Sequence, residues 1–513
     1  MVCTSQPLAA QAGLDILKKG GNAVDAAIAT AAALTVLEPT SNGIGGDCFA
    51  LVWTGGKLHG LNASGPSPKA LTREEVLKRG YQTMPFTGWV PVTVPGLPAG
   101  WAGLSERFGR LSLEEVVEPA ANYAEEGYPV SPVISLLWQE AYHLYKKEGI
   151  GPEFQEWFKV FAPEGRAPRA GELWRSPYHG GTLREIARTK GQAFYKGSLA
   201  SAIHQFSLDT GGLIRKEDLE AYQPEWVEPI SVNYRGYDVW EIPPNGHGIV
   251  ALMALNILKG MEFTERDNAE TIHRQLEAMK LAFADGKRYI ADPRSMKVNT
   301  EQLLNEAFAA ERRRLITGEA RDPAPGKPEG AGTVYLCTAD SQGNMVSYIQ
   351  SNYRGFGSGL VVPGTGIALH NRGTNFYMDP ASENCVGPEK KPYHTIIPGF
   401  LTKDGQAVGP FGVMGAFMQP QGHVQVVMNT VDFHLNPQQA LDGFRWQWTE
   451  GRTILVEPGF PQELVTALAA KGHDIHYAPH NRNFGRGQII WRDEQGIFCG
   501  GSEYRTDGCV AAW

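Results

Sequence analysis

Two glycine-rich segments are the first candidates for chemistry in this chain. The Gly-Ile-Gly-Gly run at 43–46 and the glycines of 355–359 could each cradle a phosphate with backbone amides. The first segment lacks the Gly-Lys-Ser/Thr ending of a phosphate loop and precedes a predicted strand, and the second matches the spacing of neither dinucleotide motif. We therefore expect both segments to be structural turns.

Histidines and aspartates offer a second set of candidates. His473, His476 and His480 have the spacing of metal ligands, but no pattern of carboxylates or thiols accompanies them, so we expect a solvated loop and no bound metal. Asp285 and Asp292 fit a helix cap and a turn. The sequence has no Gly-x-Ser-x-Gly elbow and no His-Glu-x-x-His motif, so local motifs leave the function open.

The elements that must position any site belong to an ordinary globular protein. The chain has 513 residues, of which 42% are hydrophobic and 20% charged, and such a length favours about three domains. The formal net charge of −8 argues against a nucleic-acid-binding surface. The longest apolar candidate, residues 26–37, is shorter than the roughly 18 residues that span a bilayer, so we expect a buried helix and no membrane contact.

The cysteines and the N-terminus predict the compartment. The six cysteines are widely spread and contain no Cys-x-x-Cys pair, so they predict free thiols rather than a disulfide framework. Residues 1–20 lack the charged, apolar and small-residue regions of a secretory signal. We therefore predict a cytoplasmic protein.

Helices dominate the first two thirds of the chain. Ser5 and Pro7 fit the start of a helix that stops at Gly20-Gly21, and a second helix starts at Asn22 or Asp25 and ends at Pro39. The other elements expected in this part are strands at 48–53 and within 225–242, and helices at 111–219 and at 246–317 with a break at Asp292-Pro293.

A glycine- and proline-rich segment at 318–332 precedes a change of pattern. After it, strands are expected at 333–339 and 345–351 around a turn at 340–344. The remaining predictions are strands at 366–370, 396–401, 487–492 and 496–499, and helices at 419–432 and 463–472. Blocks of helices and strands in this order fit an α+β fold better than a doubly wound one.

Several of these segments, in order, resemble the γ-glutamyltransferases (glutathione hydrolases), a family of N-terminal nucleophile hydrolases. The similarity covers essentially the whole chain and rests on segments 5–13, 19–27, 38–39, 43–47, 94–96, 243–248, 284–293 and 429–436. The resemblance implies a four-layer αββα sandwich of the N-terminal nucleophile hydrolase type. It also implies that a large segment, 1–332, and a small one, 333–513, build this fold jointly after self-cleavage.

In that family the precursor cuts itself before a threonine, which becomes the nucleophile. The matching residue here is Thr333, so the resemblance implies cleavage between Gly332 and Thr333. The chemistry suits the residue, because its hydroxyl can attack the Gly332 carbonyl and hydrolysis of the ester frees an α-amino group. That amine, with a reference pKa of about 7.7–8.0, can then act as base for the same hydroxyl. Local sequence alone would predict only a β-branched strand residue.

Two further catalytic assignments carry over from the family. Ser351 stands where a threonine hydrogen-bonds the nucleophile, and Gly415-Ala416 stands where a Gly-Gly pair forms the oxyanion hole. Backbone N–H groups bind the oxyanion, so an alanine is acceptable where its φ is negative. Without the resemblance, a strand serine and a tight turn would explain these residues.

The donor pocket departs from the family pattern. Ser64 stands where an arginine binds the donor carboxylate, and Asn375 where an aspartate binds the donor ammonium. His394-Thr395 replaces a Ser-Ser pair, and Tyr353 replaces an asparagine beside the nucleophile. The segment 377–391 is shorter than the lid that some members of the family carry there. Loss of a bidentate arginine–carboxylate contact should weaken donor binding strongly, so we expect weak activity on glutathione.

These departures resemble a branch that includes γ-glutamyltransferase-like proteins, cephalosporin (glutaryl) acylases and oxamate amidohydrolases. Arg354, Arg372 and Lys391 are candidates for a substitute anion anchor. We predict a self-processing amidohydrolase or acyltransferase that attacks a γ-glutamyl-type amide and resolves the acyl-enzyme with water or an amine. The alternatives are an acylase for another acyl amide (glutaryl, a cephalosporin side chain or oxamate) and, from another class, an unprocessed non-catalytic binding protein.

The predicted partners are a small-molecule amide or peptide substrate and the chain's own cleaved subunit, with no organic cofactor. The oligomeric state stays open, with a homodimer or a larger assembly among the alternatives. Members of the family usually carry some tens of residues before the motif at 5–7, where this chain begins almost on it. A truncated start is therefore an alternative that weakens the cytoplasmic prediction.

Overall fold

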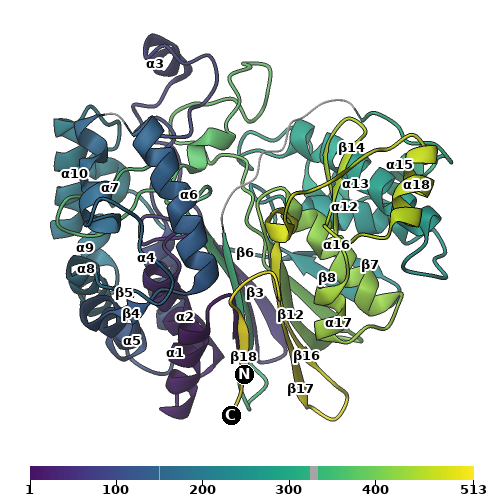
Figure 1. The fold of residues 1–513 in the computed structure, drawn as a ribbon, viewed down its shortest axis with the longest axis horizontal. Helices are drawn as coiled ribbons and strands as arrows, with labels where there is room; N and C mark the ends of the chain where they lie inside the picture. Colours follow the sequence, from purple (N-terminus) through teal and green to yellow (C-terminus); the bar gives the residue numbers. More distant parts are fainter. Residues whose placement is uncertain (150, 324–332) are drawn as a thin grey trace.

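The computed structural model of the protein describes residues 1–149, 151–323 and 333–513. Two antiparallel sheets pack face to face at its centre, and a layer of helices covers the outer face of each (Figure 1). The layers therefore follow the order helix, sheet, sheet, helix, and the αββα sandwich expected from the sequence is confirmed.

The two central sheets take strands from both sides of the 324–332 segment. The first has the strand order β18-β1-β9-β10-β2-β3-β6 and the second β17-β16-β12-β11-β8-β7. The first consists of β1 (Val2–Thr4), β2 (Asp47–Thr54), β3 (Lys57–Ala63), β6 (Glu225–Val227), β9 (Val334–Ala339), β10 (Met345–Ser351) and β18 (Cys509–Ala511). The second consists of β7 (Ile230–Tyr234), β8 (Tyr237–Glu241), β11 (Gly399–Lys403), β12 (Gln406–Met414), β16 (Arg486–Arg492) and β17 (Phe498–Ser502).

Helices form the two outer layers (Figure 1). The layer on the first sheet includes α1 (Pro7–Lys18), α2 (Ala23–Leu37), α4 (Leu97–Phe108), α5 (Leu113–Glu126), α6 (Pro132–Glu148), α7 (Gln155–Phe161), α8 (Pro177–Arg188), α9 (Gln192–Tyr195) and α10 (Ser198–Asp209). The layer on the second includes α12 (Gly248–Leu258), α13 (Ala269–Tyr289), α15 (Glu306–Arg313), α16 (Met418–Val431), α17 (Pro437–Asp442) and α18 (Gln462–Ala470). Shorter elements are α3 (Arg73–Lys78), α11 (Lys216–Glu220), α14 (Thr300–Leu303), and the small sheets β4 (Tyr128–Pro129) with β5 (Leu173–Trp174) and β13 (Trp446–Glu450), β14 (Thr453–Val456) and β15 (Asp474–Tyr477).

Strand β9 shows how the layers hold together. Its Val334 and Leu336 pack into the apolar cluster shared with α2, whereas Tyr335 and Cys337 pack into the cluster between the two sheets. All six residues of the strand are buried. A strand covered on both faces is apolar throughout rather than alternating, which is why this segment is readily predicted from sequence.

The N-terminal helices agree with prediction apart from one cap. Asn22 caps α2 and forms a capping box with Asp25. For α1, however, the N-cap is Gln6, whose side chain accepts from the Ala9 amide, and the prediction of Ser5 is wrong. The longer side chain of Gln6 can reach the amide of the first turn. Ser5 instead donates to Glu38 Oε2 at 2.6 Å.

One predicted strand is absent from the described residues. Residues 366–370 form only isolated bridges, which join Ala368 to Val361 and Leu369 to Gly45. Gly364 and Gly366 both have a φ of +71°, so the chain turns here instead of extending along a neighbour. The predicted division of the chain at 332/333 falls at the edge of residues 324–332, which lie outside the described part. Within the described part, no helix combines the length and apolar character needed to cross a bilayer.

Candidate active site

The predicted nucleophile lies where three neighbouring strands end. Thr333 directly precedes β9, Ser351 ends β10, and Asp47 begins β2, where it is paired with Ser351 across the sheet. The Thr333 and Ser351 hydroxyl oxygens are 3.1 Å apart, and both residues are buried. The structure therefore brings the two predicted hydroxyls together; Gly332, on the other side of the predicted cleavage, lies outside the described residues.

Tyr353 fixes the orientation of Ser351. Its backbone amide donates to Ser351 Oγ at 2.7 Å, which occupies one lone pair of the serine oxygen. Tyr353 itself has a φ of +75°, an uncommon conformation for a residue with a side chain, and such strain is found at functional sites. The turn that follows β10 therefore holds the serine in one position beside the nucleophile.

The predicted oxyanion-hole residues form the turn from β12 into α16. The carbonyls of Gly415 and Ala416 accept from the amides of Met418 and Gln419 at 2.9 and 3.1 Å. Their φ angles are +132° and +49°, so Ala416 does not meet the condition of a negative φ. The left-handed angle costs an alanine about 1 kcal/mol. It arises because the chain leaves a buried strand and enters a buried helix within three residues.

A buried charged network lies directly beside the two hydroxyls. Asp47 contacts the Arg372 guanidinium at 3.3 and 3.4 Å, accepts from His394 Nε2 at 2.7 Å, and lies 3.3 Å from His370 Nδ1. All four side chains are 0% exposed. Burial opposes ionisation, yet Arg372 and His394 hold the pKa of the Asp47 carboxyl well below its usual range. The carboxylate is therefore the charged centre of the network.

The network holds three of the five predicted substrate-binding residues. Arg372 donates to Thr395 Oγ1 at 2.8 Å, and its guanidinium lies 4.9 Å from the centre of the Tyr353 ring. His394 binds Asp47 directly. In the sequence Asp47 is visible only as the end of a glycine-rich motif, and nothing in one sequence pairs it with residues more than 300 positions away.

His394 is neutral in this network. Its Nε2 donates to Asp47, and its Nδ1 accepts from the Ile396 amide at 3.3 Å, which is the pattern of an uncharged ring. Burial and the nearby Arg372 lower its pKa to about 4. We therefore expect His394 to position Asp47 through its Nε2–H without carrying a positive charge at neutral pH.

Only two of the predicted substrate-binding residues line the large cavity of the described structure. This cavity has a volume of about 1180 Å³, and Tyr353 and Asn375 are in its wall. Ser64 lies elsewhere, fully buried, with its hydroxyl donating to Asn62 Oδ1 at 2.7 Å. His394 and Thr395 belong to the Asp47 network. The predicted pocket is thus divided between a cavity wall and a buried polar layer.

The three candidate anion anchors all bind something else. Arg372 is paired with Asp47, and Lys391 lies 2.9 Å from Glu225. The Arg354 guanidinium lies 4.7 Å from the centre of the Phe86 ring. Among the described residues that line the cavity, none of the three occurs, whereas Lys287 and several arginines do.

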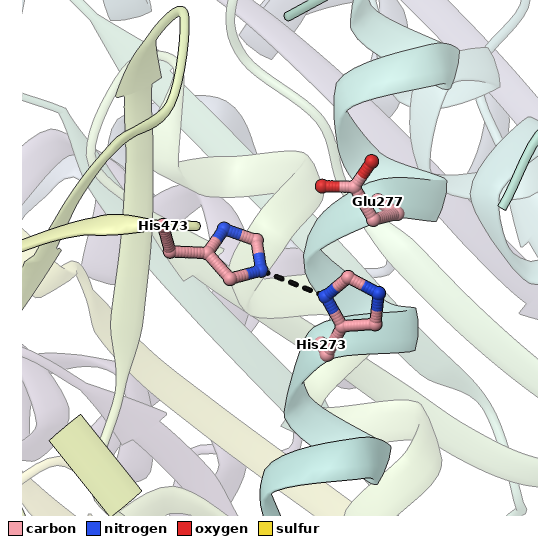
Figure 2. A group of neighbouring side chains, drawn as sticks. All are labelled: His273, Glu277 and His473. Carbon is pink, nitrogen blue, oxygen red and sulfur yellow. Dashed lines mark hydrogen bonds between the residues drawn. The ribbon is translucent and has the colours of Figure 1, made fainter. Parts of the chain in front are cut away.

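The prediction of a solvated loop is wrong for His473, which is buried. His476 is exposed on β15, 2.9 Å from Asp474, and His480 follows that strand. His473 is buried and belongs to a different group, with His273 and Glu277 of α13 (Figure 2). The ligand atoms of these three lie within 4.8 Å of one another, so the cluster has the residue types of a metal site.

A directed hydrogen-bond chain explains this cluster better than a metal. His273 Nε2 donates to the Thr317 carbonyl at 2.7 Å, so its Nδ1 accepts from His473 Nε2 at 2.8 Å. His473 Nδ1 then faces the Lys280 ammonium at 3.4 Å. Coordination of a metal by His473 Nε2 would place a proton on Nδ1 against that ammonium. Lys280 also donates to the Arg321 carbonyl at 3.2 Å, so the chain anchors residues 317–321, which precede the predicted cleavage site.

Buried neutral histidines predict a loss of stability in mild acid. Burial lowers the pKa of His179 and His394 to about 4 and that of His473 to about 3. The unfolded chain binds these protons near the ordinary pKa of about 6.5, so stability falls as the pH drops below that value, by about 1.4 kcal/mol per histidine at pH 5.5. Urea unfolding of wild type and His179→Gln at pH 7.5 and 5.5 measures one contribution, because the variant should lose less stability. Parallel losses in the two proteins would contradict it.

Comparisons with known proteins agree over the whole chain. The gamma-glutamyltranspeptidase family matches residues 9–513. The chain is 35% identical over 523 residues to the glutathione hydrolase-like YwrD proenzyme of Bacillus subtilis (99% of this chain, 98% of that protein). It is 32% identical over 534 residues to the oxamate amidohydrolase proenzyme of Klebsiella pneumoniae (100% and 98%). Among solved structures, the cephalosporin acylase from Bacillus halodurans is 61% identical, with a TM-score of 0.98 over 100% of this chain and 95% of that one.

Proposed function

The chain belongs to the gamma-glutamyltranspeptidase family of amide-bond hydrolases and transferases, and from that premise we propose that Thr333 is its nucleophile and that its preferred donor is not a γ-glutamyl compound. The observation that carries the first part is the buried pair of Thr333 and Ser351 hydroxyls, 3.1 Å apart. Loss of the Thr333 hydroxyl would mark a non-catalytic relative, and the chain keeps it together with the Ser351 hydroxyl beside it.

The proposed reaction uses Thr333 twice. In the precursor its hydroxyl attacks the Gly332 carbonyl, and the Gly332–Thr333 C–N bond breaks, which gives an ester and the free α-amino group of Thr333. Water then hydrolyses the ester, which releases the Gly332 carboxylate and restores the Thr333 hydroxyl. That amine then takes the hydroxyl proton as the oxygen attacks the substrate carbonyl, and returns it to the departing amine. Water or a second amine, deprotonated by the same group, attacks the ester and releases the acyl product. The amides of Gly415 and Ala416 are proposed to stabilise the oxyanion.

The donor is inferred from what the pocket lacks. A γ-glutamyl group carries an α-carboxylate and an α-ammonium, which require an arginine and a carboxylate. At these positions the chain has Ser64, held by Asn62, and the uncharged Asn375. The neutral amide of Asn375 offsets little of the free energy that is needed to desolvate the donor's ammonium. The relatives named as a cephalosporin acylase and an oxamate amidohydrolase support a donor without that ammonium.

A matched series of anilides tests the donor. Glutaryl 4-nitroanilide differs from the γ-glutamyl compound only by the missing α-amino group. We expect a kcat/KM at least about 10-fold higher for glutaryl, which corresponds to loss of one charged hydrogen bond. Oxamate hydrolysis, followed by ammonia release, is measured in parallel on protein whose small chain begins at Thr333 by N-terminal sequencing. A γ-glutamyl rate above both others would overturn the donor assignment.

A further inference from the structure

The large cavity has a wall that is rich in cations. Its basic lining residues are Lys280, Lys287, Arg288, Arg312 and Arg321. Carboxylates neutralise several of them: Lys280 lies 2.8 Å from Glu277, Arg288 lies 3.1 Å from Glu383, and Arg312 is bonded to Asp285. These ion pairs stabilise the wall of the cavity.

Lys287, a further cation of this wall, is surrounded by aromatic rings. It is on α13 and only 8% exposed, and its ammonium lies 5.2, 5.6 and 5.9 Å from the ring centres of Trp448, Phe417 and Phe283. Three aromatic rings from three elements thus stabilise a cation in a place that water reaches poorly. Burial lowers the pKa of Lys287 to about 8, with Glu450 acting in the opposite direction, so the amine is mostly charged at neutral pH.

The same rings connect Lys287 to the proposed catalytic residues. Phe417 directly follows Ala416 of the proposed oxyanion hole, and it stacks on Tyr393 with ring centres 6.0 Å apart. Phe417, Tyr393 and Tyr353 all line the cavity with Lys287, and Tyr353 binds Ser351 through its amide. Phe417 therefore joins the turn of 415–416 to the part of the cavity wall that holds Lys287.

We propose that Lys287 determines substrate specificity by binding a carboxylate of the amide substrate. The inference rests on the proposed function, because the cavity is the substrate site only where Thr333 is the nucleophile. It names the substrate class as amides with a carboxylate at one end, either in the acyl part or in the departing amine. A carboxylate entering a poorly hydrated aromatic wall gains a charge-assisted hydrogen bond that water screens little.

The test compares substrates that differ only in one carboxylate. Pentanoyl 4-nitroanilide replaces the distal carboxylate of glutaryl 4-nitroanilide by a methyl group. Pentanoyl 3-carboxy-4-nitroanilide carries the carboxylate in the departing amine instead. For each pair, the ratio of kcat/KM with and without the carboxylate is measured in wild type and in Lys287→Met, whose unbranched apolar side chain fits among the rings.

We expect Lys287→Met to lower the ratio for one of the two pairs by about 10- to 100-fold, the usual effect of a hydrogen bond to a charged group, with the pentanoyl rate within about 3-fold of wild type. The affected pair identifies whether the carboxylate is in the acyl part or the departing amine. Lys287→Arg should retain most of the ratio. Arg274→Gln, which removes another cation of the same helix that is not among the described residues lining the cavity, is the control and should leave both ratios unchanged. Unchanged ratios in Lys287→Met would overturn the proposal.

A binding measurement separates failure of this inference from failure of the proposed function. Two pairs of uncleaved analogues are titrated into the processed wild type and into Lys287→Met, with calorimetry as the readout, because it requires no turnover. Glutaramate and pentanamide differ in the carboxylate of the acyl part, and 5-amino-2-nitrobenzoate and 4-nitroaniline differ in that of the departing amine. Tighter binding of the carboxylate member of either pair in wild type alone supports Lys287 even where no anilide is cleaved. Equal binding within both pairs in wild type, in a protein that is processed and cleaves pentanoyl 4-nitroanilide, would overturn Lys287 and leave Thr333 intact.

Discussion

Replacing Thr333 by alanine should leave a single chain of about 56 kDa without amidase activity, where the wild type gives two. Scaling the mass of 56.0 kDa by length, we expect wild-type fragments of roughly 36 and 20 kDa, the smaller beginning at Thr333. The reason is that one hydroxyl performs both reactions, so an alanine removes the attacking atom from each. Intact mass spectrometry and N-terminal sequencing of freshly purified protein measure the first effect, and anilide cleavage measures the second.

Two further variants separate the hydroxyl from its surroundings. Thr333→Ser keeps the attacking oxygen and should still be processed, more slowly because serine has more rotamers to lose. Ser351→Ala keeps the nucleophile but removes its 3.1 Å partner, and should slow both reactions without abolishing them. An alanine variant at 333 that is cut at the same bond, or that turns over substrate, would contradict the mechanism.

The central layers of the fold are predictable because their local sequence and their burial agree. The predicted strand at 333–339 is β9 within one residue, and 345–351 coincides with β10, since an apolar run with a tight turn between its halves fits only a buried hairpin. The prediction failed at 366–370, where positive φ angles at Gly364 and Gly366 turn the chain. Glycine spacing alone does not distinguish a bulged strand from a loop.

The candidate site is less predictable because its polar contacts join distant parts of the sequence. The Thr333–Ser351 pair lies on one hairpin, so its geometry follows once both strands are placed. Arg372 could be identified as a cation but not as the partner of Asp47. Lys287 looks like an ordinary surface lysine of an amphipathic helix until Phe417 and Trp448, from another part of the chain, fold against it.

Replacing Asp47 by asparagine should destabilise the protein by about 3–5 kcal/mol, the usual cost of removing one partner of a buried ion pair. The carboxylate is the only described acidic group that contacts Arg372, and both side chains are 0% exposed. An asparagine leaves the guanidinium charged in a place without water. Arg372 also holds Thr395 and lies against Tyr353, so kcat should fall together with the free energy of unfolding, which is measured in urea.

The double variant Asp47→Leu with Arg372→Met tests whether charge pairing is the cause. Replacing both partners by apolar side chains leaves no buried charge, so it should cost less than Asp47→Asn alone, even though more atoms change. Glu125→Gln is the matched control, because its ion pair with Arg184 is 36–44% exposed and should be worth less than about 1 kcal/mol. Two results would mean that Asp47 acts by packing rather than by charge. One is a loss of unfolding free energy for Asp47→Asn no larger than that for Glu125→Gln. The other is a double variant that is less stable than Asp47→Asn.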